Sequence, residues 1–474
     1  MIWYRLHVWP IWLLLGLMFL AACQSDALPD ETGGGEPIVA HSDSSYINLR
    51  IVNNQIPMTR ATEAATAKEN AIYDGILCIF EGDNESTAQL KTAVVIDQLI
   101  NNPGNSTSID ITQRLAIGTH AYSPNIYVLA LLNTTSTGFK VGGVNNNELL
   151  FDGVSKKNAT ISQIQNLVIH SVGSTEEHVG LFMSNAPQEG SIMPRVASSY
   201  LYDTEQAATA GSRLTINVER AAARVKVTNG SPTLSINLDG DENRHPTVHR
   251  LTWALNNYNT QSFAIRYGST AAENWATSIS GTPISFDTTV PDVFDLYKQH
   301  SYKDGDAVYI AENTTDDATD QTEVIVEVQL KEGSFLLGDC YRYWFWGEDP
   351  ILFTSAEKFI KYCKDGWKEK FSINFTAIRN KSAEEVFKYP SFVINNNGSV
   401  TLTLTNDSFT TDEKDALVGL SNTLSGLLTG YRDGKMYYTT KIKHSDARYG
   451  VVRNNAYNLN VTTALGIGDP VPIP

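Results

Sequence analysis

Apolar and polar residues alternate in one short stretch near the start of the chain. Ile47, Leu49 and Ile51 are separated there by polar residues. This period of two predicts a β-strand with one buried face. Pro57 stops the strand pattern, and Arg60 follows in a short polar stretch as an isolated basic residue. The pattern therefore predicts a strand followed by a site that a trypsin-like protease can cut.

Cleavage after Arg60 would leave Ala61 as the first residue and separate the strand from the domain it completes. Such a loss opens an apolar groove lined by unpaired backbone groups, which is a template for a strand from another chain. We expect Ile47, Leu49 and Ile51 to fill that groove before cleavage. Arg50 is an alternative cleavage position, but a cut there would divide the strand.

The rest of the chain contains short runs of β-branched and aromatic residues separated by turns rich in Gly, Asn and Thr. These runs predict strands at 76–80, 92–96, 126–132, 214–218, 224–227, 250–255, 262–267, 307–310, 323–330, 399–404, 435–442 and 458–462. Helices are expected only at 86–98 and 159–168. Many short strands with few helices predict an all-β chain of two tandem antiparallel β-sandwiches. The turn sequence at 229–232 predicts their boundary, giving domains 61–230 and 231–474.

The first residues have the pattern of an export signal. Arg5 precedes an apolar run at 11–20 that is too short for a stable membrane-spanning helix. The run leads into Leu-Ala-Ala-Cys, a lipobox, which predicts a signal peptide at 1–22 and lipid attachment at Cys23. An ordinary signal peptide is the alternative. The polar, Gly- and Pro-containing residues that follow predict a flexible tether, so 23–60 would comprise the tether and the removable strand.

Charge and cysteine content narrow the class of protein. The formal net charge of −16 argues against a nucleic acid or an anionic lipid as partner. The chain is long enough for at least two domains with substantial cores. Besides Cys23 it has Cys78, Cys340 and Cys363. At most one intramolecular disulfide is therefore possible. We expect Cys340 to pair with Cys363, and Cys78 to be a buried thiol.

Three stretches of the sequence are candidates for a chemical or binding site. His245 and His249 are four apart, but Pro246 and the missing glutamate favour a solvated turn over a metal site. The acidic stretch at 239–243 resembles a calcium loop, yet Arg250 occupies the position of its closing glutamate. The stretch at 341–346 is dense in aromatic residues and predicts either a core strand or a surface platform for a glycan or a protein. The sequence shows no catalytic constellation, so we expect no enzyme activity, no cofactor and no metal.

Four motifs carry a resemblance to a known family: VERAAARV at 218–225, GLFMSNA at 180–186, GKMYY at 434–438 and YGVVRNNAYNL at 449–459. With them the chain resembles the fimbrillins, the donor-strand (type V) pilins of Bacteroides-like bacteria, and most of all their short-fimbria major-subunit branch. The resemblance extends from the lipobox to about residue 468. The motif at 449–459 is the most specific of the four.

The resemblance implies two transthyretin-like β-sandwich domains and a precursor anchored to the outer membrane by lipid. Cys23 matches the lipidated cysteine, and Arg60 matches the residue after which an arginine-specific protease cuts. A strand from a neighbouring fimbrial subunit would then replace the removed strand. The implied location is a surface fimbrium, and the implied role is structural support of adhesion to a ligand that the resemblance does not identify.

One departure from the family concerns the end of the chain. Stalk subunits of the family continue into a strand-bearing tail that acts as donor, whereas the last nine residues here, 466–474, include three prolines. Proline cannot supply a row of ladder donors. A subunit that accepts a strand but donates none would sit at the fimbrial tip, which is our expectation. The alternatives are a stalk subunit, or a surface lipoprotein that binds glycan or protein and never polymerises.

Overall fold

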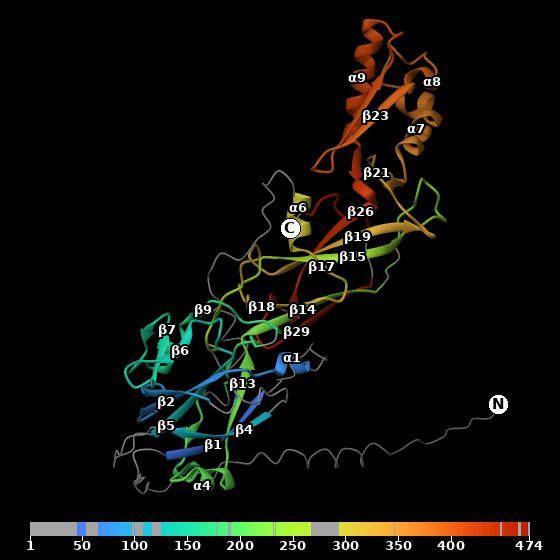
Figure 1. Ribbon diagram of the computed structural model, residues 1–474. Coiled ribbons are helices and arrows are strands. Elements are labelled where there is room, and N and C mark those ends of the chain that lie inside the picture. The colour runs from blue at the N-terminus through green and yellow to red at the C-terminus, as the bar shows by residue number, and fades with distance from the viewer. Residues whose placement is uncertain are drawn as a thin grey trace, which may run out of the picture.

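The computed structural model describes residues 45–53, 65–96, 99, 108–115, 125–176, 178–187, 191–230, 232, 234–266, 293–345, 347–445, 448–462 and 466–472. These residues form an elongated arrangement of three parts (Figure 1). A sheet containing the N-terminal strands lies at one end, a β-sandwich lies in the middle, and a part that carries the longest helices lies at the other end.

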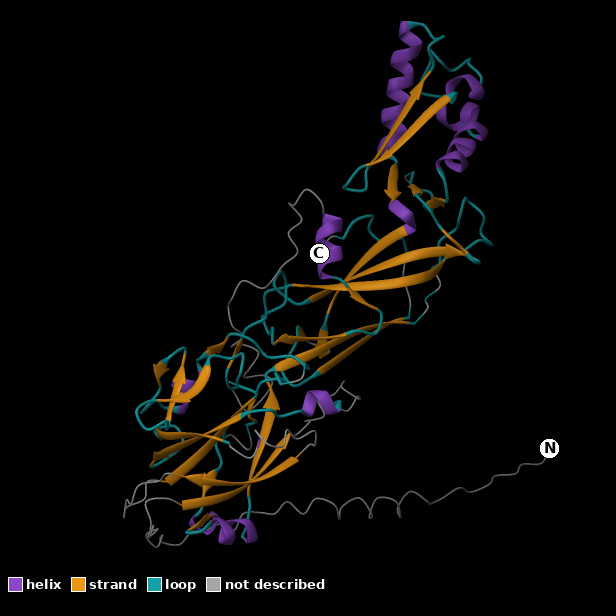
Figure 2. Ribbon diagram, in the orientation of Figure 1, coloured by secondary structure: helices purple, strands orange, loops and turns teal. Residues whose placement is uncertain are grey.

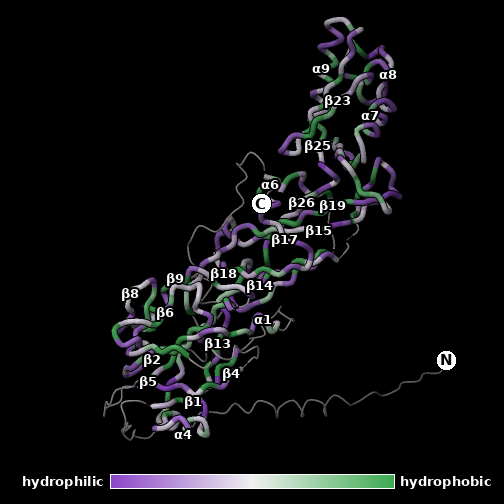
Figure 3. The backbone as a smooth tube through the Cα atoms, in the orientation of Figure 1, coloured by the Kyte–Doolittle hydropathy of each residue, from purple (hydrophilic) through white to green (hydrophobic). Residues whose placement is uncertain are grey.

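The first part is built on a nine-stranded sheet with the order β12-β1-β13-β10-β5-β2-β3, to which β4 and β11 also pair. Two clusters of buried side chains flank it. One cluster contains residues of β1, β4 and β13 together with residues of β2 and β5, so distant strands of the sheet share a core. The apolar runs of β2 and β5 follow from this burial on both faces (Figure 3).

The elements of this part are β1 (Ser45–Asn53), α1 (Ala67–Asn70), β2 (Gly75–Gly82), β3 (Gln89–Val95), β4 (Ser108–Leu115), β5 (Asn125–Leu132), β6 (Phe139–Gly142), β7 (Glu148–Phe151), β8 (Val154–Ser155), α3 (Ile161–Gln165), β9 (Val168–Ile169), β10 (Met183–Asn185), β11 (Arg195–Val196), η1 (Ser198–Tyr200), β12 (Leu201–Tyr202), α4 (Glu205–Ala210) and β13 (Leu214–Arg220). The short strands β6, β7 and β8 form a separate sheet.

The middle part is a sandwich of a three-stranded sheet, β18-β14-β29, and a five-stranded sheet containing β15, β17, β19, β20 and β26. Val225 from the first sheet and Trp253, Val326 and Met436 from the second share one core. Its elements are β14 (Ala222–Asn229), β15 (Thr247–Asn256), β16 (Ser262–Phe263), α6 (Val293–His300), β17 (Tyr302–Lys303), β18 (Ala307–Ala311), β19 (Glu323–Glu332), β20 (Phe335–Leu336), η3 (Arg432–Gly434), β26 (Lys435–Lys441), β27 (Lys443–Ser445), β28 (Arg448–Tyr449) and β29 (Ala456–Val461).

The third part is inserted in the chain between β20 and β26, and we call it the distal module. It has its own core, which is rich in aromatic side chains. It also contains most of the helical residues that the structure describes (Figure 2). Its elements are β21 (Cys340–Tyr343), β22 (Ile351–Phe353), α7 (Ala356–Asp365), η2 (Trp367–Phe371), α8 (Ala383–Val386), β23 (Tyr389–Ile394), β24 (Val400–Thr405), α9 (Thr411–Gly426) and β25 (Leu428–Tyr431).

The structure confirms a chain dominated by β-strands, and it corrects several details. The helix expected at 86–98 is wrong, because β3 occupies that stretch and pairs with β2. The strand expected at 262–267 is reduced to β16, which pairs with β9 of the first part. The distal module was not predicted. Its α9 turns an apolar stripe of Leu417, Leu420 and Leu424 inward, but intervening Gly, Ser and Thr residues weaken the helical signal in the sequence.

The chain also changes sheets earlier than the turn at 229–232 predicts. β13 belongs to the nine-stranded sheet, whereas β14 pairs with β18 and β29. The crossing therefore lies at Ala221, between two strands of one continuous run that has no turn residue to mark it. Buried ion pairs lie near this crossing, Arg224 with Glu69 at 3.2 Å and Arg453 with Glu312 at 2.6 Å.

The expected Cys340–Cys363 disulfide is wrong. Cys78, Cys340 and Cys363 are all free and buried. Each thiol lies in a different core cluster: Cys340, the first residue of β21, packs into the core of the middle sandwich, and Cys363 packs into the core of the distal module. Burial raises the pKa of the Cys340 thiol to about 12.

Candidate strand-exchange site around β1

β1 is an interior strand with partners on both edges. Along one edge, Ser45 to Val52 pair antiparallel with β4. On the other edge, Tyr46 and Ile47 pair antiparallel with β12, and Leu49 to Asn53 pair parallel with β13. The strand therefore occupies a slot with a backbone template on each side.

Two of these partners depend on β1 for their place in the sheet. Among the strands that the structure describes, β4 and β12 pair with β1 alone, whereas β13 also pairs with β10. Removing β1 would thus leave β4 and β12 without a ladder and β13 with one open edge.

The inner face of β1 is apolar and closed to solvent. Ile47 and Leu49 are 0% exposed and Ile51 is 1% exposed. They share a core with Ile111 of β4 and Ile216 of β13, among others. Burying side chains of this size contributes about 1.5–3 kcal/mol each. The predicted groove residues are therefore gathered in one place, and their role as removable contacts remains a prediction.

The outer face of β1 carries a buried amide that the sequence analysis did not single out. Asn48 is 2% exposed and lies beneath the C-terminal end of α4. Its Nδ2 donates to the carbonyl oxygen of Ala208 at 2.9 Å and to that of Gly211 at 3.4 Å. An amide between two apolar residues in a strand pattern was the available signal, because a buried polar group needs a partner from elsewhere in the chain.

Arg50 and Asp110 face each other across β1 and β4. Arg50 donates from Nε to Oδ1 at 2.8 Å and from its second terminal nitrogen to Oδ2 at 3.0 Å. These hydrogen bonds are the main reason that the pKa of Asp110 lies below its ordinary value. Both side chains are more than two-fifths exposed, at 44% and 41%, so the pair stabilises the strand only slightly.

The segment downstream of β1 is anchored by contacts of its own. α1 begins at a capping box formed by Thr66 and Glu69. Glu69 accepts hydrogen bonds from Arg224 of β14 at 3.2 and 3.3 Å. Asn70 accepts from Arg220 of β13 and also from Asn53, the last residue of β1, both at 3.0 Å. Only the bond from Asn53 would be lost with β1.

The predicted processing residues lie outside the described residues. These are Cys23, the signal peptide at 1–22, and the cleavage pair Arg60 and Ala61. In the sequence, Arg60 falls between the end of β1 at Asn53 and the start of α1 at Ala67.

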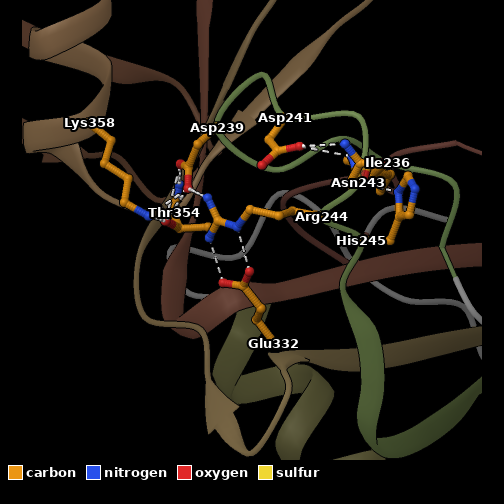
Figure 4. Close-up of polar contacts among 9 residues, drawn as sticks. All are labelled: Ile236, Asp239, Asp241, Asn243, Arg244, His245, Glu332, Thr354 and Lys358. Carbon is orange, nitrogen blue, oxygen red and sulfur yellow. Dashed lines mark hydrogen bonds and ion pairs between the residues drawn. The ribbon is translucent and has the colours of Figure 1, made fainter.

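The acidic stretch at 239–243 forms an ion-pair cluster instead of a calcium loop (Figure 4). Asp239 is bound by Arg244 at 2.6 Å and by Lys358 at 2.5 Å, and it also accepts from the backbone N–H of Thr354. Burial would raise the pKa of Asp239, but these hydrogen bonds outweigh it and hold the pKa below its ordinary value. Arg244 also binds Glu332 at 2.6 Å. The carboxylate of Asp239 is therefore already neutralised by Arg244 and Lys358 of the same chain.

The histidines lie in an ordinary polar setting. Nδ1 of His245 lies 3.1 Å from the carbonyl oxygen of Ile236 (Figure 4). Among the residues described, no group of three or more His, Cys, Asp or Glu side chains is placed to hold a metal ion. Within the same residues no helix has the length and apolarity needed to cross a membrane.

The aromatic stretch at 341–346 contains both buried core residues and exposed residues, so each of the two predicted alternatives describes part of it. Tyr341 and Tyr343 are buried in the distal module. Trp344 and Phe345 are 46% and 45% exposed. Lys370 lies over the rings of Tyr343 and Phe345 at 5.3 and 5.5 Å, so part of this aromatic surface is occupied by a lysine of the same chain.

Comparison of the sequence with protein-family models finds no match, and comparison with curated proteins finds none either. Solved structures similar to this chain include a fimbrilin from Porphyromonas gingivalis W83, with 12% identity over 90% of this chain and 92% of that one, at a TM-score of 0.39. They also include a putative cell adhesion protein from Bacteroides eggerthii, with 12% identity over 68% and 80% of the two chains and a TM-score of 0.34.

A fimbrial assembly protein from Parabacteroides distasonis is similar at 13% identity, over 62% of this chain and 83% of that one, with a TM-score of 0.33. These three structures are described as a fimbrilin, a putative cell adhesion protein and a fimbrial assembly protein. TM-scores below 0.5 mark distant likenesses.

Proposed function

We propose that the protein is a structural subunit of surface fimbriae that accepts a strand from a neighbouring subunit in place of β1. The observation that carries the proposal is the position of β1. It fills a slot between β4 and β13 with three fully buried apolar side chains. The next anchored element, α1, begins beyond Arg60 in the sequence. A cut between them would free the strand and keep α1 attached.

The proposed order of events starts with a precursor lipidated at Cys23 and held at the outer membrane. An arginine-specific protease cuts after Arg60, β1 leaves, and a neighbour's strand enters the slot. Each backbone hydrogen bond of that strand contributes about 0.5–1.5 kcal/mol net, and each buried apolar side chain about 1.5–3 kcal/mol. A strand with three apolar anchors is sufficient for a lasting linkage even after the cost of ordering it.

We further propose a terminal, adhesion-supporting position in the fimbrium. The support comes from residues 466–472, which are docked on their own domain. Tyr437 and Asp469 exchange backbone hydrogen bonds of 2.9 and 2.8 Å, and Val471 is 5% exposed. A segment held in this way is not free to enter a neighbour's slot. A stalk position would need a donor strand elsewhere in the subunit.

The test is the N-terminal sequence and mass of the protein in sheared surface filaments, compared with the membrane-bound pool. We expect filaments to contain chains that start at Ala61 without lipid. An Arg60→Lys variant keeps the charge but removes the arginine, so an arginine-specific protease should leave it at the membrane. Arg50→Lys is the matched control and should still be processed.

A lipidated start at Cys23 in every pool would contradict strand release. It would favour a surface lipoprotein that does not polymerise. Long filaments grown from the purified, processed protein alone would contradict the terminal position but not strand acceptance.

A further inference from the structure

We infer that the slot of β1 selects its incoming strand by a side-chain amide at the position of Asn48. The partner would be an extended segment of another chain with the pattern apolar–amide–apolar–basic–apolar. This inference rests on the proposed strand exchange and adds to it the chemistry by which one strand is preferred over another.

The amide position is set by Ala208 of α4 and by Gly211, which are not removed from the chain with β1. The carbonyl oxygens of Ala208 and Gly211 at the end of α4 both point at Asn48 Nδ2. Carbonyl oxygens can only accept hydrogen bonds, so the incoming side chain must donate. The N–H of Gly211 also donates to the carbonyl oxygen of Ala208, at 3.0 Å.

A carboxylate at this position would place a negative charge against two carbonyl oxygens, and an apolar side chain would leave a polar group buried without its partner. The site is closed to water, since Asn48 is 2% exposed, so solvent cannot compensate for the mismatch. The amide therefore discriminates between strands more strongly than an exposed contact would.

The basic position is a weaker element of the same recognition. Asp110 lies directly opposite Arg50 in the register of β1 and β4. Arg213 also approaches Asp110, at 3.5 Å, and would remain after β1 leaves. Because that second cation neutralises part of the charge and the pair is exposed, a basic residue is favoured here but not required.

The inner positions supply affinity without much discrimination. Ile47, Leu49 and Ile51 face a core made of aliphatic side chains, which accepts similar aliphatic residues at modest cost. Any strand with alternating apolar residues would meet this condition, so the outer face distinguishes among such strands.

The test uses the full chain with the recognition site of a highly specific viral protease in place of residues 54–59. The chain is cut in the presence of an excess of a labelled peptide, and the label retained on the protein is measured by size-exclusion chromatography. The reference peptide is the sequence of β1, SYINLRIVN. The matched control carries Asn48→Val and Val52→Asn together, so its composition is unchanged but the amide moves four residues along the same face of the strand.

We expect the protein to capture at least tenfold less of the control peptide than of the reference peptide. A peptide with Asn48→Asp should be captured about a hundredfold less than the reference. Equal capture of the reference and the control would overturn the inference while leaving strand exchange intact. Failure to capture any peptide, the reference included, would contradict the proposed function itself.

A second measurement does not depend on exchange. In the uncut chain, Asn48→Val with Val52→Asn should lower the melting temperature of the first part by several degrees, whereas Val52→Asn alone should change it much less. Equal shifts for the two variants would also overturn the inference.

Discussion

The parallel strand pairs β1–β13 and β14–β29 occupy corresponding places in two parts of the molecule. In the first part, the opening strand β1 runs parallel to the closing strand β13. In the middle sandwich, the opening strand β14 runs parallel to the closing strand β29. Both β1 and β29 contain an Asn-Leu pair, Asn48-Leu49 and Asn458-Leu459.

Their surroundings differ. β1 has a partner on each edge and buries six of its nine residues. Among the described strands, β29 pairs only with β14, and apart from the buried Tyr457 its residues are exposed or partly covered. A strand inside a sheet leaves a slot with two templates when it departs, whereas a strand at an edge leaves a surface with one. Exchange between subunits is therefore suited to β1.

The largest expected difference is in stability. Leu49→Ala removes a side chain that is 0% exposed and should destabilise the first part by about 2–5 kcal/mol, because the surrounding core cannot close the cavity. Leu459→Ala is the matched change in β29 and should cost about 1 kcal/mol, since Leu459 is only partly buried. Urea denaturation of both variants measures the two losses. Similar losses would remove the contrast between the strands.

Loss of a strand should also affect its neighbours differently. When β1 is cut out, amide hydrogen exchange in β4 should accelerate by about a hundredfold or more, because β4 loses its only described partner. β13 should change less, since β10 still pairs with it. Truncation before β29 should leave exchange in β18 nearly unchanged, because β18 keeps β14. Protection of β4 that survives removal of β1 would contradict this dependence.

A smaller effect should appear with pH. Hydrogen bonds from Arg50 hold the pKa of Asp110 below its ordinary value, so the carboxylate favours the strand-bound state. That stabilisation is complete above about pH 4, the ordinary value for Asp, and is lost as pH falls through the lowered pKa. At these low pH values, β1 should dissociate faster after cleavage. The increase in its dissociation rate should correspond to no more than about 1 kcal/mol. The matched variant Asp110→Asn should show no such dependence from this group.

The smallest expected effect is that of a reducing agent. Cys78, Cys340 and Cys363 are free in the described residues, so reductant should not change the melting temperature of a chain that lacks Cys23. All three thiols should react with a maleimide after denaturation without prior reduction. If two of the three thiols failed to react, the result would show that a disulfide forms after all. The middle sandwich would then contain a covalent cross-link that the first part lacks.

The sequence predicted most strands because their apolar runs are local. β2, β5, β15 and β19 each fall where a run of β-branched or aromatic residues predicts a strand. The helix α9 was missed because its apolar positions are spaced among Ser, Thr and Gly residues, which weaken the helical signal. The sheet crossing at Ala221 was missed because one apolar run serves two sheets.

The same division applies to the candidate site. Alternation in the sequence predicted that Ile47, Leu49 and Ile51 share a face, and the motifs predicted a fimbrillin-like chain of β-strands. Neither could predict that β1 is interior, that β4 depends on it, or that α4 covers Asn48. Period and propensity are properties of neighbouring residues, whereas strand order and the partner of a buried amide are settled by contacts between segments such as Asn48 and Ala208, 160 residues apart. Local alternation selects the residues of the strand, and contacts between distant segments hold the strand in place.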